Sequence, residues 1–344
     1  MKVGLSYWGF CEKFHNSTVS NTPDGHRYGR PVLVDALLAR NHEVYSLQEK
    51  REAVPYPGMY YDYAGKEYPD IDVLFVEWRW PTYKNFGEKK FEPDLDRQTS
   101  LLDFYHGKIP IIVWDTDLKM TSYEERRWPE VIIADPSFEP RLLTRKRSRL
   151  TFWSDFKPLI ETKSDLIEFG YIGNNYERDR MFSKYYSSPS RILRSSGTQT
   201  KVHGNWLQRS PERASPEELI KGHPNIAFGP RVSFQDSMKL LNNFICTVHI
   251  TKPDYAKVGF ASPRYLENIV VGTPALVPSE FKYSTLLGER WKVSSSEEAV
   301  KLVSYLKSLS HEQRQDVVHE QRDSLLMYHD FSVDNVVNFI ESLM

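Results

Sequence analysis

The sequence contains little cysteine: two residues in 344, Cys11 and Cys246. Two thiols cannot build a disulfide framework or a zinc site of the CxxC type, so both of those small-domain classes are excluded. The chain also lacks any run of about 18 apolar residues, which argues against a membrane-spanning helix. Its first residues have neither the basic nor the apolar region of a signal peptide. We therefore expect a protein of the reducing cytoplasm, without a membrane partner.

An excess of charge of either sign is also missing. Lys and Arg total 45, Asp and Glu total 46, and the formal net charge is -1. This balance excludes a histone-like protein whose whole surface binds polyanions, but it leaves room for one basic groove. Hydrophobic residues make up 40% and charged residues 26%, which is typical of a globular protein. A length of 344 residues favours two domains.

Three common motifs are absent: GxGxxG, GxxxxGK[ST] and GxSxG. Their absence argues against a dinucleotide fingerprint, a Walker loop and the nucleophile turn of α/β-hydrolases. The tetrapeptide HEQR begins at His311 and again at His319. It does not form the zinc motif HExxH, because Gln315 stands where the second histidine is needed. The sequence therefore predicts no metal site.

Short apolar runs alternate with helical patterns along the whole chain. The runs are rich in Val, Ile and Leu without strict alternation, which is typical of parallel strands covered on both faces. Strands are expected at 2–7, 43–47, 71–77, 110–114, 130–134, 168–172, 201–203, 244–250 and 274–277. This pattern predicts an α/β fold with two units, 1–160 and 161–315. A helical segment, 316–344, follows, and its return to the first unit stays open.

The stretch 262–278, SPRYLENIVVGTPALVP, contains the most informative pattern. Pro263 suits the first position of a helix, and Arg264 and Glu267 then lie one turn apart on one face. A guanidinium beside the amide groups of a helix start suits a diphosphate. A carboxylate one turn later can accept both hydroxyls of a ribose. A plain surface ion pair between the two side chains explains the same spacing equally well.

A loop with glycine and arginine follows the strand expected at 168–172. It begins with Gly173 and Asn174, and Arg178 and Arg180 stand at the start of the next helix. Glycine lets the backbone approach a ligand closely, and arginine forks match phosphate oxygens. The loop therefore favours phosphate binding, with a surface helix carrying ordinary charge pairs as the alternative.

Two acids, Asp115 and Asp117, follow the strand expected at 110–114. Ligands collect at the carboxyl ends of strands in open α/β sheets, and a carboxylate there can take a proton from an attacking hydroxyl. The structural alternative is an N-cap for the next helix. The basic run 141–149, RLLTRKRSR, is either a solvated surface or a phosphate-contacting patch.

Taken in order, these features resemble those of the GT-B glycosyltransferases. The likeness is greatest to the DNA β-glucosyltransferases of T-even phages and looser to spore-maturation-type glycosyltransferases. Over most of the chain it includes Gly204-Asn205, the segment 228–232 and the helix with Arg264 and Glu267. The resemblance implies two Rossmann-like domains facing each other across a cleft. The second would hold a UDP-sugar, and the first would hold the acceptor.

The resemblance also implies roles for individual residues. Donor-binding roles fall on Gly173, Asn174, Arg178, Arg180, Val232, Arg264 and Glu267. Among these, Arg264 would bind the pyrophosphate, Glu267 the ribose, and the backbone at Val232 the uracil edge. The general base is Asp117 or Asp115, and both remain open. Acceptor candidates in the first half are Asp24, His26, Trp78, Arg79, Arg145 and Arg147.

The implied reaction is the attack of an acceptor hydroxyl on the anomeric carbon of the sugar. The diphosphate then leaves, and the positive charge of the arginines stabilises its negative charge. A single in-line displacement inverts that carbon, and a retaining course stays open. No cofactor is essential in this interpretation, and a divalent ion such as Mg²⁺ or Mn²⁺ is an option for diphosphate release.

The expected acceptor is a 5-hydroxymethylpyrimidine in double-stranded DNA, reached in an extrahelical position. A small molecule, a protein or a polysaccharide is the alternative acceptor. The expected oligomeric state is a monomer, acting in the cytoplasm of a bacterial host if the chain is encoded by a bacteriophage.

Overall fold

The chain forms two compact units in a computed structural model. The residues that the structure describes are 1–9, 11, 26–49, 56–61, 67–85, 92–161, 163, 166–208 and 215–344. Among them, unit 1 contains 1–9, 11, 26–155 and 331–344, and unit 2 contains the rest. The chain therefore passes from one unit to the other at 155/156 and 330/331, whereas the sequence pattern placed the boundaries at 160/161 and 315/316.

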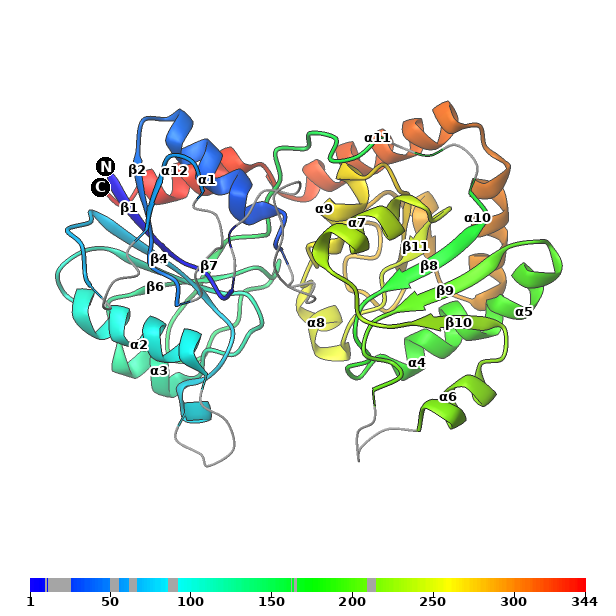
Figure 1. Cartoon of the computed structure of the whole chain (residues 1–344), viewed down its shortest axis with the longest axis horizontal. Coiled ribbons are helices and arrows are strands. Elements are labelled where there is room, and N and C mark those ends of the chain that lie inside the picture. Colours follow the sequence, from blue (N-terminus) through cyan, green and yellow to red (C-terminus); the bar gives the residue numbers. More distant parts are fainter. Residues whose placement is uncertain are drawn as a thin grey trace. The chain divides into compact units, whose positions relative to one another are not determined.

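Unit 1 is built on an all-parallel sheet of seven strands (Figure 1). The strands are β1 (Lys2–Ser6), β2 (Glu43–Ser46), β3 (Met59–Tyr61), β4 (Val73–Trp78), β5 (Ile111–Asp115), β6 (Ile132–Asp135) and β7 (Ser148–Arg149). Their order is β3-β2-β1-β4-β5-β6-β7, so the direction of growth reverses between β1 and β4. In open α/β sheets, ligands bind at the carboxyl ends of the strands beside such a reversal.

Both faces of the unit 1 sheet are covered. The helices are α1 (Gly29–Ala39), α2 (Pro93–Tyr105), α3 (Ser122–Arg127) and α12 (Val333–Glu341), with a 3-10 turn, η2, at Thr82–Asn85. Along β4, Leu74 and Val76 join the core cluster that includes residues of α2. Phe75, which points to the other face, contacts the rings of Trp114 and Trp153. Burial of both faces explains why this strand is apolar apart from Glu77, which is paired with the buried Arg30 at 2.9 Å.

Unit 2 contains two three-stranded parallel sheets, β10-β9-β8 and β11-β12-β13. The strands are β8 (Glu168–Ile172), β9 (Gln199–His203), β10 (Ile226–Gly229), β11 (Thr247–Val248), β12 (Ala275–Pro278) and β13 (Lys292–Val293). The edges of β8 and β11 are joined where the Ile245 amide donates to the Glu168 carbonyl (2.7 Å) and the Gly170 amide to the Cys246 carbonyl (3.4 Å). In the combined order, β10-β9-β8-β11-β12-β13, the direction of growth again reverses, here between β8 and β11.

Helices follow nearly every strand of unit 2. They are α4 (Asp179–Phe182), a π-helical turn η3 (Ser183–Ser187), α5 (Ser188–Ser195), α6 (Pro216–Gly222), α7 (Phe234–Asn242), α8 (Pro253–Val258), α9 (Arg264–Val270), the 3-10 turn η4 (Glu289–Trp291), α10 (Ser296–Ser308) and α11 (His311–Tyr328). Helix α9 packs against α7 and α11, while α5 packs against α10. Alternating strands and helices are the local requirement for a parallel sheet, since each parallel connection needs a crossover.

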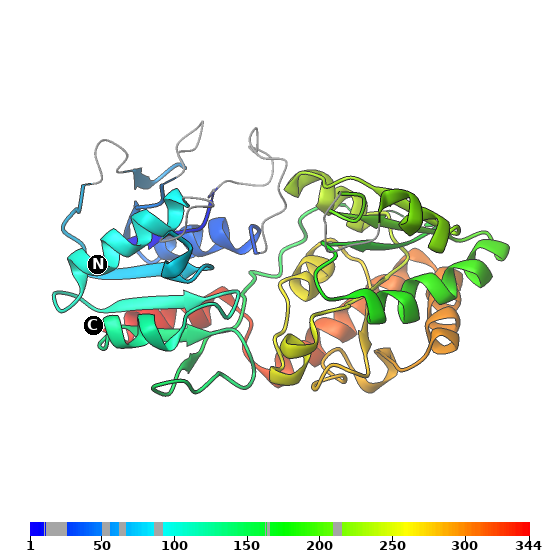
Figure 2. The same ribbon diagram turned by 90° about the horizontal axis from the view of Figure 1, so that it is seen from below.

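The last helix returns to unit 1. Both ends of the chain lie on this unit, near each other in the two views (Figures 1 and 2). The guanidinium of Arg40, just after α1, donates to Asn338 (2.7 Å), Asp334 (2.6 Å) and Glu341 (2.8 Å) of α12. The C-terminal helical segment is thus divided, because α11 belongs to unit 2 and α12 packs on unit 1.

Replacing Arg40 by alanine should loosen α12, because one guanidinium then no longer links α1 to three of its side chains. The local cost should be about 1 kcal/mol, as for other partly exposed ion pairs. Hydrogen–deuterium exchange should be faster across 331–344 and unchanged in unit 2. The control is Lys2→Ala, which removes an exposed ion pair to Asp70. Equal exchange of α12 in Arg40→Ala and the wild type would contradict this account.

Candidate active site

Two loops of unit 2 meet at the carboxyl ends of β8 and β9. The Gly173 amide donates to the His203 carbonyl (2.9 Å), and the Trp206 indole donates to the Gly173 carbonyl (2.7 Å). Gly204 has a φ of +152°, and a Cβ added there would lie 2.1 Å from the Gly173 carbonyl oxygen. Only glycine allows this approach. The contact holds the two loops side by side.

Asparagine side chains extend this contact between the loops. The Asn175 amide donates to the side chain of Asn205 (2.7 Å), and the Asn205 amide donates to the side chain of Asn174 (3.2 Å). Arg178 donates from Nη1 to the Asn174 carbonyl (2.8 Å). Its Nε is buried and has no hydrogen-bond partner among the described residues. The structure therefore brings Gly173, Asn174 and Arg178 together, as the loop sequence suggested.

Helix α9 carries a carboxylate that is almost completely buried. Glu267 is 1% exposed and accepts a hydrogen bond from Arg264 Nη1 at 2.5 Å, while the Arg264 side chain is 22% exposed. The two side chains do form the ion pair considered above, but the pair is not a plain surface pair. A half-buried guanidinium beside a buried carboxylate offers donors and acceptors to one ligand.

His249 lies just after β11, beside the same helix, and sequence reasoning missed it. Its Nε2 lies 3.1 Å from Asn268 Oδ1, and its ring stacks on Tyr265 at 4.0 Å. Burial is the main reason that the pKa of His249 is lowered to about 3; the hydrogen bond to Asn268 opposes the shift and the positive charge of Arg264 adds to it. The ring is thus neutral at pH 7. The only sequence signal was its place at the end of an apolar run.

Contacts between loops bring the groups described above to one edge of the unit 2 sheet. Lys252, in the loop after β11, lies 3.9 Å from the carboxylate of Glu177 and over the ring of Tyr176. The loops after β8, β9 and β11 therefore meet at the point where the strand order reverses. Of the remaining donor candidates, Arg180 is exposed on α4, and Val232 is half-buried after β10.

In unit 1, Asp115 is fully buried and its oxygens are occupied. Oδ1 accepts from the Lys119 amide (2.6 Å), and Oδ2 accepts from the Met120 amide (3.0 Å). Oδ2 also accepts from Arg141 (2.7 Å) and Arg147 (2.9 Å). Burial raises the pKa of Asp115, and the two arginines act against that rise. This arrangement is that of a residue that organises the loop before α3; the N-cap of that helix is Thr121, so Asp115 is not the N-cap considered above.

Asp117 lies in the turn that Asp115 organises, and its side chain is half-buried. The preceding residue, Thr116, donates through its amide and its hydroxyl to the Trp78 carbonyl, both at 3.1 Å. The following residue, Leu118, has a φ of +54°. A branched side chain in this left-handed region is strained, and such strain clusters at functional sites. The geometry separates the two acids that the sequence left equivalent.

The basic run 141–149 is not a continuous cationic surface. Arg147, expected to contact the acceptor, is buried and bonds to Glu125 at 2.7 Å as well as to Asp115. Arg145 donates to a backbone carbonyl oxygen, and burial lowers its pKa. Lys146 and Arg149 are exposed. The expectation for Arg147 is corrected, since a charge paired inside the protein cannot reach a phosphate.

Other acceptor candidates also lie inside unit 1. Trp78 is fully buried and meets Trp128 edge to face, so it packs in the core and cannot stack on a base. Arg79 is paired with Glu77 at 2.7 Å. His26 is 1% exposed among aromatic rings, and burial lowers its pKa well below the ordinary value. Asp24 lies outside the described residues.

Neither a metal cluster nor a membrane helix is found within the described ranges. There, no group of three or more His, Cys, Asp or Glu side chains could hold a metal ion. No helix in the same ranges is long and apolar enough to cross a membrane.

Comparison with known proteins identifies the fold. Residues 189–338 match the family model described as Glycosyl transferase-like. A search of curated protein sequences finds no match. Among solved structures, the chain is similar to AviGT4, a glycosyltransferase involved in avilamycin A biosynthesis (12% identity, TM-score 0.52, 95% of this chain and 96% of that one). It is also similar to a mutant O-GlcNAc transferase of Thermobaculum terrenum (10% identity, TM-score 0.51, 99% of this chain and 66% of that one).

At such low identity these structures show the fold alone. The fold is GT-B, and the fold class expected from the sequence is confirmed. The match over residues 189–338 agrees with the expected enzyme class and falls on the unit that holds α9 and its ion pair, with its last residues in α12.

Arg147→Met should destabilise unit 1 by about 3–5 kcal/mol, because the buried Glu125 then loses its arginine partner and Asp115 loses one of its two. Urea unfolding followed by circular dichroism measures the change. The matched control is Lys146→Met, at the exposed neighbouring position, which should stay within about 0.5 kcal/mol of the wild type. Similar stabilities for the two variants would show that the network around Asp115 is not as described.

Proposed function

We propose that this glycosyltransferase of GT-B fold transfers a sugar from a nucleotide-sugar, specifically a UDP-sugar, to an acceptor hydroxyl. The observation that carries the proposal is the meeting of three loops of unit 2 at one strand edge. There, backbone approach at Gly173 and Gly204 combines with the cations of Arg178 and Arg264 and with the buried Glu267. A site with these groups is suited to a nucleoside diphosphate.

Each group of this edge takes a role in the proposal. Arg264 and Arg178 balance the charge of the diphosphate, since guanidinium forks match phosphate oxygens. Glu267 accepts the ribose hydroxyls, and the backbone near Val232 reads the uracil edge. Arg180, exposed on α4, adds positive charge next to the loop that follows β8. The unpartnered Nε of Arg178 supports this role, because an uncompensated buried donor favours an acceptor.

We assign the general base to Asp117. Asp115 already accepts four hydrogen bonds inside unit 1, so a further proton donor has no access to it. In the proposed reaction the acceptor oxygen bonds to the anomeric carbon as its proton passes to Asp117. The bond from that carbon to the diphosphate breaks, and the leaving charge is stabilised by the arginines. One displacement of this kind inverts the anomeric carbon.

The acceptor we propose is the hydroxyl of a 5-hydroxymethylpyrimidine in double-stranded DNA. Trp80, two residues after β4, is 36% exposed with the ammonium of Lys84 over its ring, and it supports contact with a base. The exposed Lys146 and Arg149 support contact with phosphates. The burial of Trp78 and Arg147 removes two of the contacts first expected, so a smaller hydroxyl acceptor is the alternative.

A transfer assay tests the acceptor directly. The protein is incubated with UDP-glucose, UDP-galactose or UDP-N-acetylglucosamine and with duplex DNA containing 5-hydroxymethylcytosine or 5-hydroxymethyluracil. Mass spectrometry of the nucleosides should show one added sugar on the modified base and none on unmodified DNA. Sugar transfer only to non-DNA acceptors would select the alternative acceptor.

Asp117→Asn should lower turnover by about 10²–10⁴-fold, the usual contribution of a general base. Its affinity for UDP and its melting temperature should stay those of the wild type, because the donor groups lie in unit 2. Asp115→Asn should instead lower the melting temperature, since Arg141 and Arg147 then each lose one of the carboxylates that they face. An active Asp117→Asn enzyme would remove Asp117 from the mechanism.

A further inference from the structure

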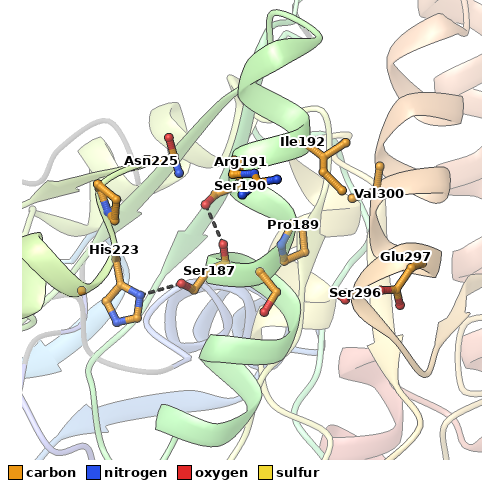
Figure 3. Close-up of a pocket in the computed structure, with 13 residues that line it drawn as sticks. Ser187, Pro189, Ser190, Arg191, Ile192, His223, Asn225, Ser296, Glu297 and Val300 are labelled. Carbon is orange, nitrogen blue, oxygen red and sulfur yellow. Dashed lines mark hydrogen bonds between the residues drawn. The ribbon is translucent and has the colours of Figure 1, made fainter.

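Unit 2 holds a second site, a pocket of about 440 Å³ that the donor candidates do not line (Figure 3). Helix α5, the turn 222–225 before β10 and the first turn of α10 form its walls. Its volume is within the range of about 300–1,000 Å³ that small-molecule sites occupy. The proposed transfer reaction gives it no task.

Both hydrogen-bond donors and hydrogen-bond acceptors line this pocket. Arg191 presents an exposed guanidinium that forms no hydrogen bond or ion pair with the part of the chain that is described. Glu297 presents an exposed carboxylate, and hydrogen bonds from its own amide and from neighbouring serines lower its pKa. Asn225 adds an amide, and four serine hydroxyls complete the polar lining. At neutral pH the charges of Arg191 and Glu297 cancel.

The wall formed by α5 is fixed by internal hydrogen bonds. His223 Nδ1 lies 2.6 Å from the hydroxyl of Ser187, and the hydroxyl of Ser190 donates to the Ser187 carbonyl at 2.6 Å (Figure 3). Burial lowers the pKa of His223, against the nearby charge of Asp179, so the imidazole adds no charge at pH 7. Ser187 ends the π-helical turn η3, and such turns occur frequently at functional sites.

Hydrogen bonds link the wall formed by α10 to the wall formed by α5. Lys307 of α10 donates to the carbonyl oxygens of Ser196 and Gly197, just after α5, at 3.0 Å each. Helices α5 and α10 are thereby held at a set separation. The pocket is preformed, which reduces the entropy that binding would cost.

Aliphatic groups separate the polar ones. Pro189, Ile192, Pro224 and Val300 line the pocket, and Ile192 is 52% exposed. A sugar ring has C–H faces and an edge that carries hydroxyl groups. The aliphatic side chains can pack on the C–H faces, and the polar groups between them can form hydrogen bonds with the hydroxyls. A phosphate would need a net positive site, and the Glu297 carboxylate opposes it. We infer that this pocket binds a neutral saccharide through Arg191, Glu297 and Asn225, separately from the donor loops.

Saturation-transfer NMR and calorimetry on the full chain test the inference, with maltotriose, cellotriose and chitotriose as probes. At least one trisaccharide should bind saturably. Ile192→Trp, which fills the pocket from an exposed position, should abolish that binding and leave UDP affinity unchanged. Arg191→Ala should weaken it about tenfold, as expected for loss of one charge-assisted hydrogen bond. The control is Lys221→Ala, an exposed lysine of α6 outside the lining, which should bind like the wild type.

Three results would overturn the inference. They are no binding of any of the three trisaccharides, binding that survives in both Ile192→Trp and Arg191→Ala, and Arg191-dependent binding of inorganic phosphate. Circular dichroism of each variant confirms that it is folded. If the wild type does not bind UDP, that result counts against the proposed function and not against the saccharide pocket. The two failures are therefore distinguishable.

Discussion

Gly204 approaches the carbonyl oxygen of Gly173 so closely that a Cβ added there would lie 2.1 Å from that oxygen. This approach leaves no room for a side chain, so the loops after β8 and β9 lie directly against each other. The asparagine bridges depend on that distance, because Asn174 and Asn205 each reach the backbone of the other loop. Arg178 is in turn held by the Asn174 carbonyl. One glycine contact therefore positions the loop that carries Arg178, one of the two arginines proposed to bind the diphosphate.

In unit 1, buried ion pairs position the turn that contains the candidate base, Asp117. A buried group of charges, with Arg147 between Asp115, Glu125 and Asp135, fixes the loops that follow β5 and β6. Such a group is costly to desolvate and is stable only when every charge has a partner. Its consequence is a rigid turn that leaves Asp117 half-buried beside a strained Leu118. The buried charges around Asp115 therefore have a structural role in unit 1.

Much of the fold was predictable from the sequence, because parallel strands buried on both faces read as apolar runs. The strand at 168–172 coincides with β8, and the loop after it contains the arginine and glycine groups that the structure brings together. The run 244–250 was less informative. Only Thr247–Val248 pairs as β11, since the residues before it bond to β8.

The side-chain environments in unit 1 were not predictable. Two acids separated by one residue look equivalent in a sequence, yet one is saturated with donors and the other is half-buried. Trp78 was misplaced because a residue at a strand end can face the core or the solvent, and alternation alone does not tell which. Arg147 was misplaced because a basic run does not reveal buried acids contributed by distant segments. His249 was missed because a single histidine after a short strand carries no spacing signal.

Hydrogen–deuterium exchange with and without UDP tests the central claim most directly. The account predicts slower exchange at 173–178, 204–206 and 264–267 when UDP is present. It also predicts that Gly204→Ala abolishes this protection, since the added Cβ would collide with the Gly173 carbonyl. Protection confined to unit 1, or the same protection in the Gly204→Ala variant, would contradict it.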